Sequence, residues 1–243
     1  VGVAFTQALP IWNGVNLPWY HFGYDIGADF DREWFDATLQ SVRSNGANAV
    51  RFWLHADGRS SPTFATDGTV TGAGGPTFLD DVRELVTIAR HHHLVLQICL
   101  WSFDMCKQDA PGVGLHHDLI GDPVKTQSYI RRALVPLLEA IGDDPNVVIE
   151  VMNEPEWCMA GSCNTKQCVG VEQMQRFTAK IATAVHEHSR LTVTTGAASL
   201  KWLTQRPDRG SGQAFYWSDA ALRAAYPAGG RACELDFCIL CAW

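Results

Sequence analysis

The sequence lacks the features that mark several large classes of protein. Its 243 residues contain no run approaching the ~18 consecutive apolar residues of a membrane-spanning helix, so no membrane association is expected. Basic side chains are outnumbered, since 19 Lys and Arg against 26 Asp and Glu leave a formal net charge of −7. Because proteins bind nucleic acid largely through Lys and Arg contacts with phosphate, a nucleic-acid partner is not expected either.

Linkers, low-complexity tracts and charge runs are also absent from the sequence. Hydrophobic residues make up 47% of the chain and charged residues 19%, which supplies a core and carries no signature of disorder. We therefore expect residues 1–243 to form a single domain.

Eight cysteines are too few for a disulfide scaffold and many for a cytosolic enzyme. Cys158, Cys163 and Cys168 crowd one short stretch, CMAGSCNTKQC, and Cys106 lies in another loop-like segment. Loop disulfides are the preferred interpretation; a zinc site is the alternative, but no His follows the cluster closely. The chain opens at Val1 without Met or a leader, which is consistent with a removed signal peptide and predicts a secreted protein.

Short apolar or β-branched runs alternate with longer stretches that have helical periodicity. The pattern predicts strands over residues 11–16, 49–54, 94–100, 147–152, 191–195 and 235–240. It predicts helices over residues 31–45, 78–92, 125–141, 169–189 and 218–226. Such alternation indicates an α/β fold with a parallel sheet that is buried on both faces.

Two α/β architectures fit this order, a doubly wound sheet and a (β/α)8 TIM barrel. The segment at the first predicted strand and its turn, GVNLPW, has neither the G-x-G-x-x-G nor the Walker A pattern of a nucleotide-binding loop. Polar and aromatic residues instead follow the carboxyl end of strand after strand, where barrel enzymes carry their chemistry. We therefore predict a barrel, with about six of its βα units visible.

The strongest local motif is VIEVMNEPEW, at residues 148–157. It places Asn153 and Glu154 at the tip of a strand, before Pro155 ends regular pairing. A carboxylic acid beside an amide that can hydrogen-bond a sugar hydroxyl is typical of a glycosidase general acid/base. A surface Glu in an ordinary turn is the alternative.

Taken together, the segments GVNLPWYHFGYDIG, VRFWLHADG, LWSFDMCK, VMNEPEWC, CNTKQC and TTGAASLKW resemble glycoside hydrolase family 5. They are most similar to the animal, mollusc-type endo-β-1,4-mannanases of that family, over residues 15–237. The resemblance implies a (β/α)8 barrel, secretion, no metal or other cofactor, and retaining hydrolysis of β-1,4-mannan. A polysaccharide or oligosaccharide is then the expected partner.

The resemblance also assigns residues. Glu154 matches the acid/base, Asn153 the residue that contacts the sugar 2-OH, and Arg51 the arginine that supports the catalytic carboxylate. A structural ion pair is the alternative role for Arg51, because an arginine within an apolar strand needs some partner.

Several aromatic side chains are candidates for substrate binding. Trp101 matches an aromatic subsite at the tip of the third strand, and flat aromatic faces suit pyranose rings. Trp19, His55 and Trp157 lie on the same face by position, so either cleft lining or packing fits them. Trp243 stands where the resemblance implies an aromatic residue after the sixth strand.

A retaining glycosidase needs a second carboxyl group, which acts as the nucleophile. In this family it is a Glu at the tip of strand seven, and the sixth strand, within LDFCILCAW, is the last that we predict. This segment has Cys241 where the resemblance implies a His. The abrupt loss of the pattern favours a natural protein that continues into further strands, as a monomer unless a partner chain completes the barrel.

Two alternatives stay open for the missing nucleophile. Another carboxylate can take over its role, for which the sequence offers Asp57, Asp104, Glu156 and Glu234. Alternatively, the chain is a carbohydrate-binding pseudoenzyme. The predicted function is endo-β-1,4-mannanase, with a β-1,4-glucanase (cellulase) as the nearest alternative enzyme, because the same catalytic set serves both substrates.

Overall fold

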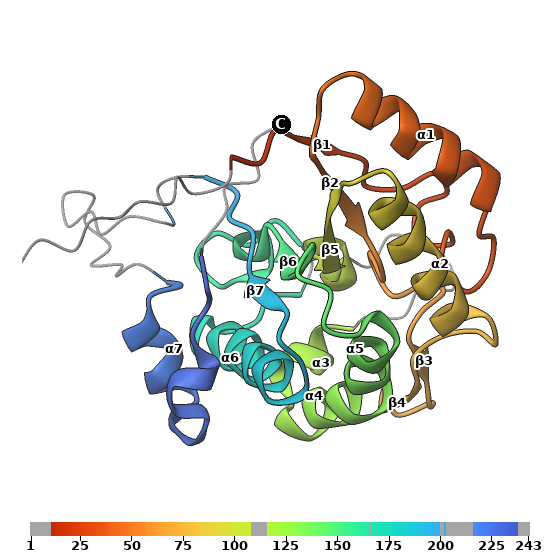
Figure 1. The fold of residues 1–243 in the computed structure, drawn as a ribbon. Helices are drawn as coiled ribbons and strands as arrows, with labels where there is room; N and C mark the ends of the chain where they lie inside the picture. Colours follow the sequence, from red (N-terminus) through yellow and green to blue (C-terminus); the bar gives the residue numbers. More distant parts are fainter. Residues whose placement is uncertain (1–10, 108–115, 166, 200–201, 203–215, 238–243) are drawn as a thin grey trace, which may run out of the picture.

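A parallel sheet forms the centre of the molecule (Figure 1). The computed structural model describes residues 11–107, 116–165, 167–199, 202 and 216–237. Its sheet has five strands, which are β1 (Gly14–Asn16), β2 (Ala49–Trp53), β5 (Val95–Ser102), β6 (Val147–Asn153) and β7 (Thr192–Thr194). Neighbours in the sheet follow chain order, β1-β2-β5-β6-β7, so within the described residues the order does not reverse as it does in a doubly wound sheet.

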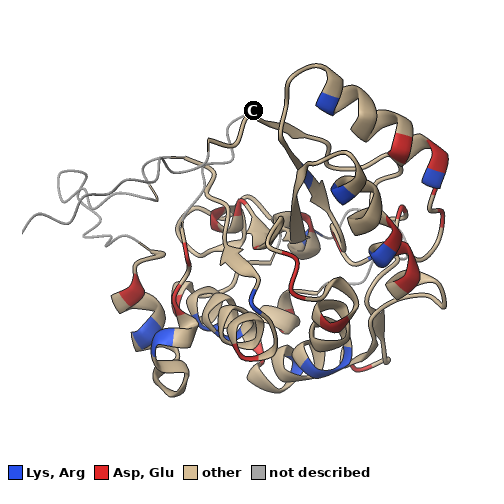
Figure 2. Cartoon of the chain, viewed as in Figure 1, with Lys and Arg blue, Asp and Glu red and all other residues tan. Residues whose placement is uncertain are grey.

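Helices cover the outside of this sheet in the same order as the strands (Figure 1). They include α1 (Arg32–Ser44), α2 (Phe78–His91), α5 (Val135–Ile141) and α6 (Val171–His188), each packed against the next of these along the chain. Charged residues lie mainly on the helices and on the loops, with few on the strands (Figure 2). The α/β fold and the strand order of a (β/α)8 barrel, both predicted from the sequence, are confirmed.

The helix boundaries follow from local chemistry. α1 begins after Asp31, whose carboxylate accepts a hydrogen bond from the backbone N–H of Trp34 at 2.9 Å. It buries Phe35 and Leu39 and ends before Gly46, whose φ of +91° suits a residue without a side chain. A capping carboxylate, a buried apolar stripe and a closing glycine therefore define this helix.

The helix predicted over residues 125–141 is interrupted. α4 (Pro123–Tyr129) passes into a π-helical turn, Ile130–Leu134, before α5 begins. Pro136 stands at the start of α5 and has no N–H to donate to the preceding turn. A π turn next to a proline is a common way for a helix to adapt its hydrogen bonds.

Two strands were missed from sequence. β3 (Thr63–Phe64) and β4 (Val70–Gly72) form an antiparallel hairpin in the loop after β2, and strands of two or three residues are too short for a periodic signal. The remaining short helices are α3 (His117–Gly121), α7 (Asp219–Ala225) and the 3-10 turns η1 (Phe103–Cys106), η3 (Pro155–Cys158) and η6 (Pro227–Cys233). No helix of the described residues is long and apolar enough to cross a membrane.

The predicted sixth strand is only partly covered. Residues 235–237 are not a strand, although they run beside β7: the Asp236 N–H donates to Val193 O at 3.0 Å, and the Thr194 hydroxyl donates to Phe237 O at 2.7 Å. Residues 238–240, and with them Cys241 and Trp243, lie outside the described residues.

The burial of residues in the core predicts that two aliphatic positions differ strongly in how much stability is lost on substitution by alanine. Ile149 in β6 is fully buried, so Ile149→Ala should lower the free energy of unfolding by about 2–5 kcal/mol through lost contacts and a residual cavity. Val124, at the start of α4, is 71% exposed, and Val124→Ala should change stability by less than about 0.5 kcal/mol. Urea unfolding followed by circular dichroism measures both; equal losses would contradict this placement of β6.

Candidate active site

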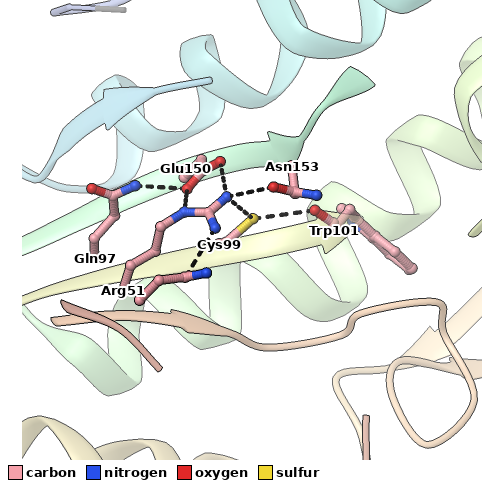
Figure 3. Close-up of polar contacts among 7 residues, drawn as sticks. Arg51, Gln97, Cys99, Trp101, Glu150 and Asn153 are labelled. Atoms are coloured by element: carbon pink, nitrogen blue, oxygen red, sulfur yellow. Dashed lines mark hydrogen bonds and ion pairs between the residues drawn. The ribbon is translucent and has the colours of Figure 1, made fainter. Parts of the chain in front are cut away.

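A buried ion pair joins the middles of two strands of the sheet, β2 and β6 (Figure 3). Arg51 from β2 donates from Nε to Glu150 Oε2 at 2.6 Å and from Nη2 to Glu150 Oε1 at 2.7 Å. The Glu150 side chain, from β6, is fully buried, and that of Arg51 is 14% exposed. Two parallel charge-assisted hydrogen bonds of this kind fix the plane of the guanidinium as well as its position.

Further polar groups converge on the same pair (Figure 3). Gln97 Nε2, from β5, donates to Glu150 Oε2 at 2.6 Å. Arg51 Nη2 also donates to Asn153 Oδ1 at 2.9 Å, and Nη1 donates to Asn16 Oδ1 at 3.2 Å. The strand register explains the convergence, because Arg51 pairs with both Asn16 and Gln97, and β5 pairs in turn with β6.

Sequence reasoning missed Glu150, the ion-pair partner of Arg51. The signal was present, because Glu150 is a lone acid inside the apolar run VVIEVM. A buried carboxylate needs a partner for the same reason that a buried arginine does. The structure thus gives Arg51 a structural ion pair and also a direct contact with Asn153, next to Glu154.

Glu154 follows β6 at once and is 9% exposed. Its backbone is left-handed, with φ +47° and ψ +53°, which is unfavourable for a residue with a side chain. Such strain clusters at functional sites, where the surrounding structure holds it. Beside it, Asn153 is fully buried, and its Nδ2 makes no hydrogen bond with the described residues, which is unusual for a buried donor.

Glu156, two residues further on, is a buried acid whose hydrogen-bond donors among the described residues are neutral. Its Oε1 accepts from the Trp217 indole N–H at 3.0 Å and its Oε2 from the Ala198 backbone N–H at 3.1 Å. Burial raises the pKa of Glu156 to about 7, and the nearby charge of Glu154 acts in the same direction. These bonds join the turn after β6 to the segment after β7 and to Trp217, which sequence reasoning did not single out.

The other three alternative carboxylates are held in ion pairs. Asp57 binds Arg59 at 2.7 Å, Asp104 binds Lys107 at 2.6 Å and Glu234 binds Arg223 at 2.8 Å. Each has a structural partner, so their geometry gives no particular support for a nucleophile among them.

His55 and Trp101 are placed in packing rather than at the surface, which is one of the two roles expected for His55 and differs from the aromatic subsite expected for Trp101. Both are buried, and their rings lie 4.9 Å apart. Trp101 falls inside β5, which extends to Ser102, rather than beyond its tip. His55 Nδ1 shares a hydrogen bond with the Ser61 hydroxyl at 2.8 Å, and burial lowers the pKa of His55 to about 3, so the ring is neutral packing.

Trp19 and Trp157 are the predicted aromatic residues that reach the surface. Trp19 is 36% exposed and packs edge-on against Trp53, with ring centroids 5.1 Å apart. Trp157 is partly exposed, and its backbone N–H donates to Glu154 O at 3.2 Å. Trp243 lies outside the described residues.

A hollow of about 600 Å³ lies between the β3–β4 hairpin and α3. Phe64 and His116 stack there, with ring centroids 4.1 Å apart, and Lys125 and Asp118 lie on its wall. Arg51, Asn153 and Glu154 do not line it, so it is separate from the predicted catalytic residues. In the described part of the chain, no three His, Cys, Asp or Glu side chains are grouped to hold a metal ion.

The buried ion pair leads to a prediction about stability. Arg51→Met removes the guanidinium that binds both carboxylate oxygens of the buried Glu150, so it should cost about 3–5 kcal/mol of unfolding free energy. The double variant Arg51→Met with Glu150→Leu removes both charges and should recover part of that loss. Urea unfolding of the wild type, Arg51→Met, Glu150→Leu and the double variant gives the coupling energy between the two side chains. If the losses of the two single variants add up to that of the double variant, the pair is not coupled.

The raised pKa of Glu156 leads to a prediction about pH. The folded protein favours the neutral acid, so the contribution of Glu156 to stability is complete below about pH 4.5 and is lost as pH rises through about 7. Between those values the wild type should lose about 3 kcal/mol relative to Glu156→Gln, which cannot ionise. Urea unfolding at pH 4 to 8 measures the stability difference between the wild type and Glu156→Gln. The titration of His55 cancels in this difference, because both proteins contain it.

Glu139→Gln is the matched control for that experiment, because Glu139 is exposed on α5. Its stability difference from the wild type should stay nearly constant with pH. If the stability difference between Glu156→Gln and the wild type also stays constant with pH, the raised pKa of the buried Glu156 is contradicted.

Comparisons with known proteins identify similar sequences and folds. No family model matches the chain. The chain is 34% identical over 151 residues to the mannan endo-1,4-beta-mannosidase of Mytilus edulis, covering 59% of this chain and 39% of that protein. It is 29% identical over 165 residues to the mannan endo-1,4-beta-mannosidase of Cryptopygus antarcticus, covering 64% of this chain and 41% of that protein. The matches thus span about two fifths of the length of these curated relatives.

The solved structures agree with the sequence matches. The β-1,4-mannanase of the sea hare Aplysia kurodai superposes with a TM-score of 0.83 at 25% identity, over 95% of this chain and 70% of that chain. The resemblance to animal endo-β-1,4-mannanases that the sequence motifs indicate is therefore confirmed in both sequence and fold.

Proposed function

We propose that this protein is a glycoside hydrolase of family 5 that cleaves β-1,4-linked mannan with retention of configuration. One observation supports this most strongly: the strained Glu154 and the buried amide of Asn153 stand together at the end of β6, with Arg51 bound to Asn153. The relatives that share the fold are named as mannanases or mannan endo-1,4-beta-mannosidases.

In this proposal Glu154 is the general acid/base. It protonates the oxygen of the leaving sugar and then takes a proton from the attacking water. The unpaired Nδ2 of Asn153 supplies a donor for a sugar hydroxyl beside the reacting carbon. Arg51 and Glu150 hold Asn153 in place, because Arg51 binds both of them.

The nucleophile is assigned to none of the carboxylates that the structure describes. A retaining enzyme needs a second carboxyl group about 5–5.5 Å from the first. Asp57, Asp104 and Glu234 are bound in ion pairs, and both oxygens of Glu156 accept hydrogen bonds. The proposal therefore keeps the family's own nucleophile, a Glu at the tip of a seventh barrel strand.

The aromatic side chains divide between two roles in this proposal. Trp19 and Trp157, which reach the surface, bind sugar rings, and Trp243 is kept as a third candidate. Trp101 and His55 form a buried layer beneath the site and stabilise it without touching substrate. A β-1,4-glucanase is not favoured, because the curated relatives are named for mannan.

Secretion is part of the same proposal. The bond between Cys163 and Cys168, in the loop after β6, is of a kind that persists in oxidising compartments. We expect a monomer unless a partner chain completes the barrel.

The enzymatic proposal predicts a split between catalysis and binding. In protein that includes the strand carrying the nucleophile, reducing ends should be released from β-1,4-mannan in preference to carboxymethylcellulose. Glu154→Gln should lower that rate by roughly 10²–10⁴-fold, because proton transfer is lost. Affinity for mannohexaose, measured by calorimetry, should change only a few-fold. Glu139→Gln, exposed on α5, is the matched control and should keep the wild-type rate.

Two results would count against this proposal in different ways. Binding of mannohexaose without release of reducing ends would favour the pseudoenzyme. Hydrolysis that survives Glu154→Gln would remove Glu154 as the acid/base while leaving the substrate class intact.

A further inference from the structure

Two cysteines meet beneath the loops that follow β5 and β6. Cys106 is the last residue of η1 and Cys158 the last residue of η3. The strands before these turns are paired, with Ser102 opposite Asn153 at the end of the ladder. Since each cysteine lies four or five residues beyond that pair, the short turns bring both to the same place.

The two thiols are in direct contact. They share a hydrogen bond, both side chains are fully buried, and η1 packs against η3. The Cys158 thiol also donates to Phe103 O at 3.3 Å, which ties it to the backbone of the other turn. Because of this burial, solvent does not reach either sulfur atom.

The other buried thiols are placed differently. The Cys99 thiol donates to Trp101 O at 3.2 Å, and the Cys233 thiol donates to Gly230 O at 3.1 Å. These two bonds stay within their own segments, and the Cys99 sulfur atom also accepts a hydrogen bond from Arg51 Nη2 at 3.8 Å. The contact between Cys106 and Cys158 instead joins two thiols from two different loops. Cys99 and Cys233 therefore serve as internal references for thiols that stay reduced.

We infer that Cys106 and Cys158 form a disulfide that joins the loop after β5 to the loop after β6. The formation is an exchange with an oxidising disulfide, either a protein or a small-molecule one. One cysteine attacks as a thiolate, forms a mixed disulfide and releases one thiol of the oxidant. The other then displaces the second thiol, so two protons and two electrons pass from the cysteine pair to the oxidant.

The exchange takes place during folding, before the turns close over the sulfur atoms, because both are inaccessible in the folded protein. The neighbouring bond between Cys163 and Cys168 provides a reference for the same oxidising conditions. This inference rests on the placement of the turns and does not depend on the proposed catalytic function.

The bond would fix the segment that carries Glu154 and Glu156. Cys158 ends the turn that begins immediately after Glu154, and Cys106 ends the turn that begins after Ser102. Linking residues that are 52 positions apart restricts the unfolded chain. The bond is therefore expected to stabilise both turns against opening.

Peptide mapping of the unreduced protein tests this inference. Protein secreted from an oxidising host is unfolded, labelled with N-ethylmaleimide, cleaved after methionine with cyanogen bromide and digested with chymotrypsin. Cleavage after Trp101, Phe103 or Met105 separates Cys99 from Cys106, and cleavage after Met159 separates Cys158 from Cys163 and Cys168. We expect Cys99 and Cys233 to carry the label, and Cys106 and Cys158 to appear as one cross-linked species that reductant splits. Reduction before labelling should add the label to both.

Variants test the pairing. Cys106→Ala should leave Cys158 labelled, Cys158→Ala should leave Cys106 labelled, and Cys99→Ala should leave the cross-link intact. The thermal midpoint of the wild type should fall by several degrees in reductant, and that of Cys106→Ala should fall less. The map itself uses the wild type, so it does not depend on the variants folding.

Two outcomes would overturn the inference. One is full labelling of Cys106 and Cys158 in protein whose Cys163 and Cys168 are linked. The other is a cross-link from either residue to Cys163 or Cys168. Neither result bears on hydrolysis of mannan, so failure here is distinct from failure of the proposed function.

Discussion

The ion pair between Arg51 and Glu150 is the constraint on which the centre of this molecule depends. A guanidinium and a carboxylate are held away from water among apolar strands, which is tolerated only when the two groups satisfy each other. Their bidentate geometry requires β2, β5 and β6 to keep one register. A slip of one residue would turn Arg51 to the opposite face of the sheet and leave Glu150 without its counter-charge.

The same strand register also fixes the position of the last residue of β6. Arg51 binds Asn153 as well as Glu150, so the last residue of the strand is fixed by the pair beneath it. Glu154 follows in a left-handed conformation and is thereby displaced from the strand direction. A strained backbone at this position needs a rigid strand before it and an anchored turn after it. Glu156 provides the second anchor through Trp217 and Ala198.

Glu150 and Glu156 illustrate how surroundings differentiate two buried acids on one segment. Glu150 faces a guanidinium, whereas Glu156 faces an indole N–H, a backbone N–H and the carboxylate of Glu154. Neutral donors offset only part of the cost of burying a charge, and burial therefore raises the pKa of Glu156 to about 7. The turn after β6 thus combines a fixed ion pair below with an acid that titrates near neutrality above.

The sequence by itself determined the order of strands and helices, because apolar periodicity is a local property that each segment carries alone. It also located Asn153 and Glu154, since a motif at a strand end needs no knowledge of neighbouring strands. Two local features were not predicted correctly from the sequence. The hairpin of β3 and β4 was too short to show a period, and the helix over residues 125–141 was interrupted by a π turn beside Pro136.

Only the tertiary structure decided which residues meet. Glu150 lies 99 positions from Arg51 and Trp217 lies 61 from Glu156, and no local pattern encodes such pairs. Trp101 was expected to bind substrate and His55 either to line the cleft or to pack, because both lie near strand ends, and in the fold both are buried. Burial depends on what covers a side chain, and the covering segments come from distant parts of the chain. Local periodicity therefore fixes the elements of this protein, whereas the chemistry near Glu154 depends on contacts that form only when those elements assemble.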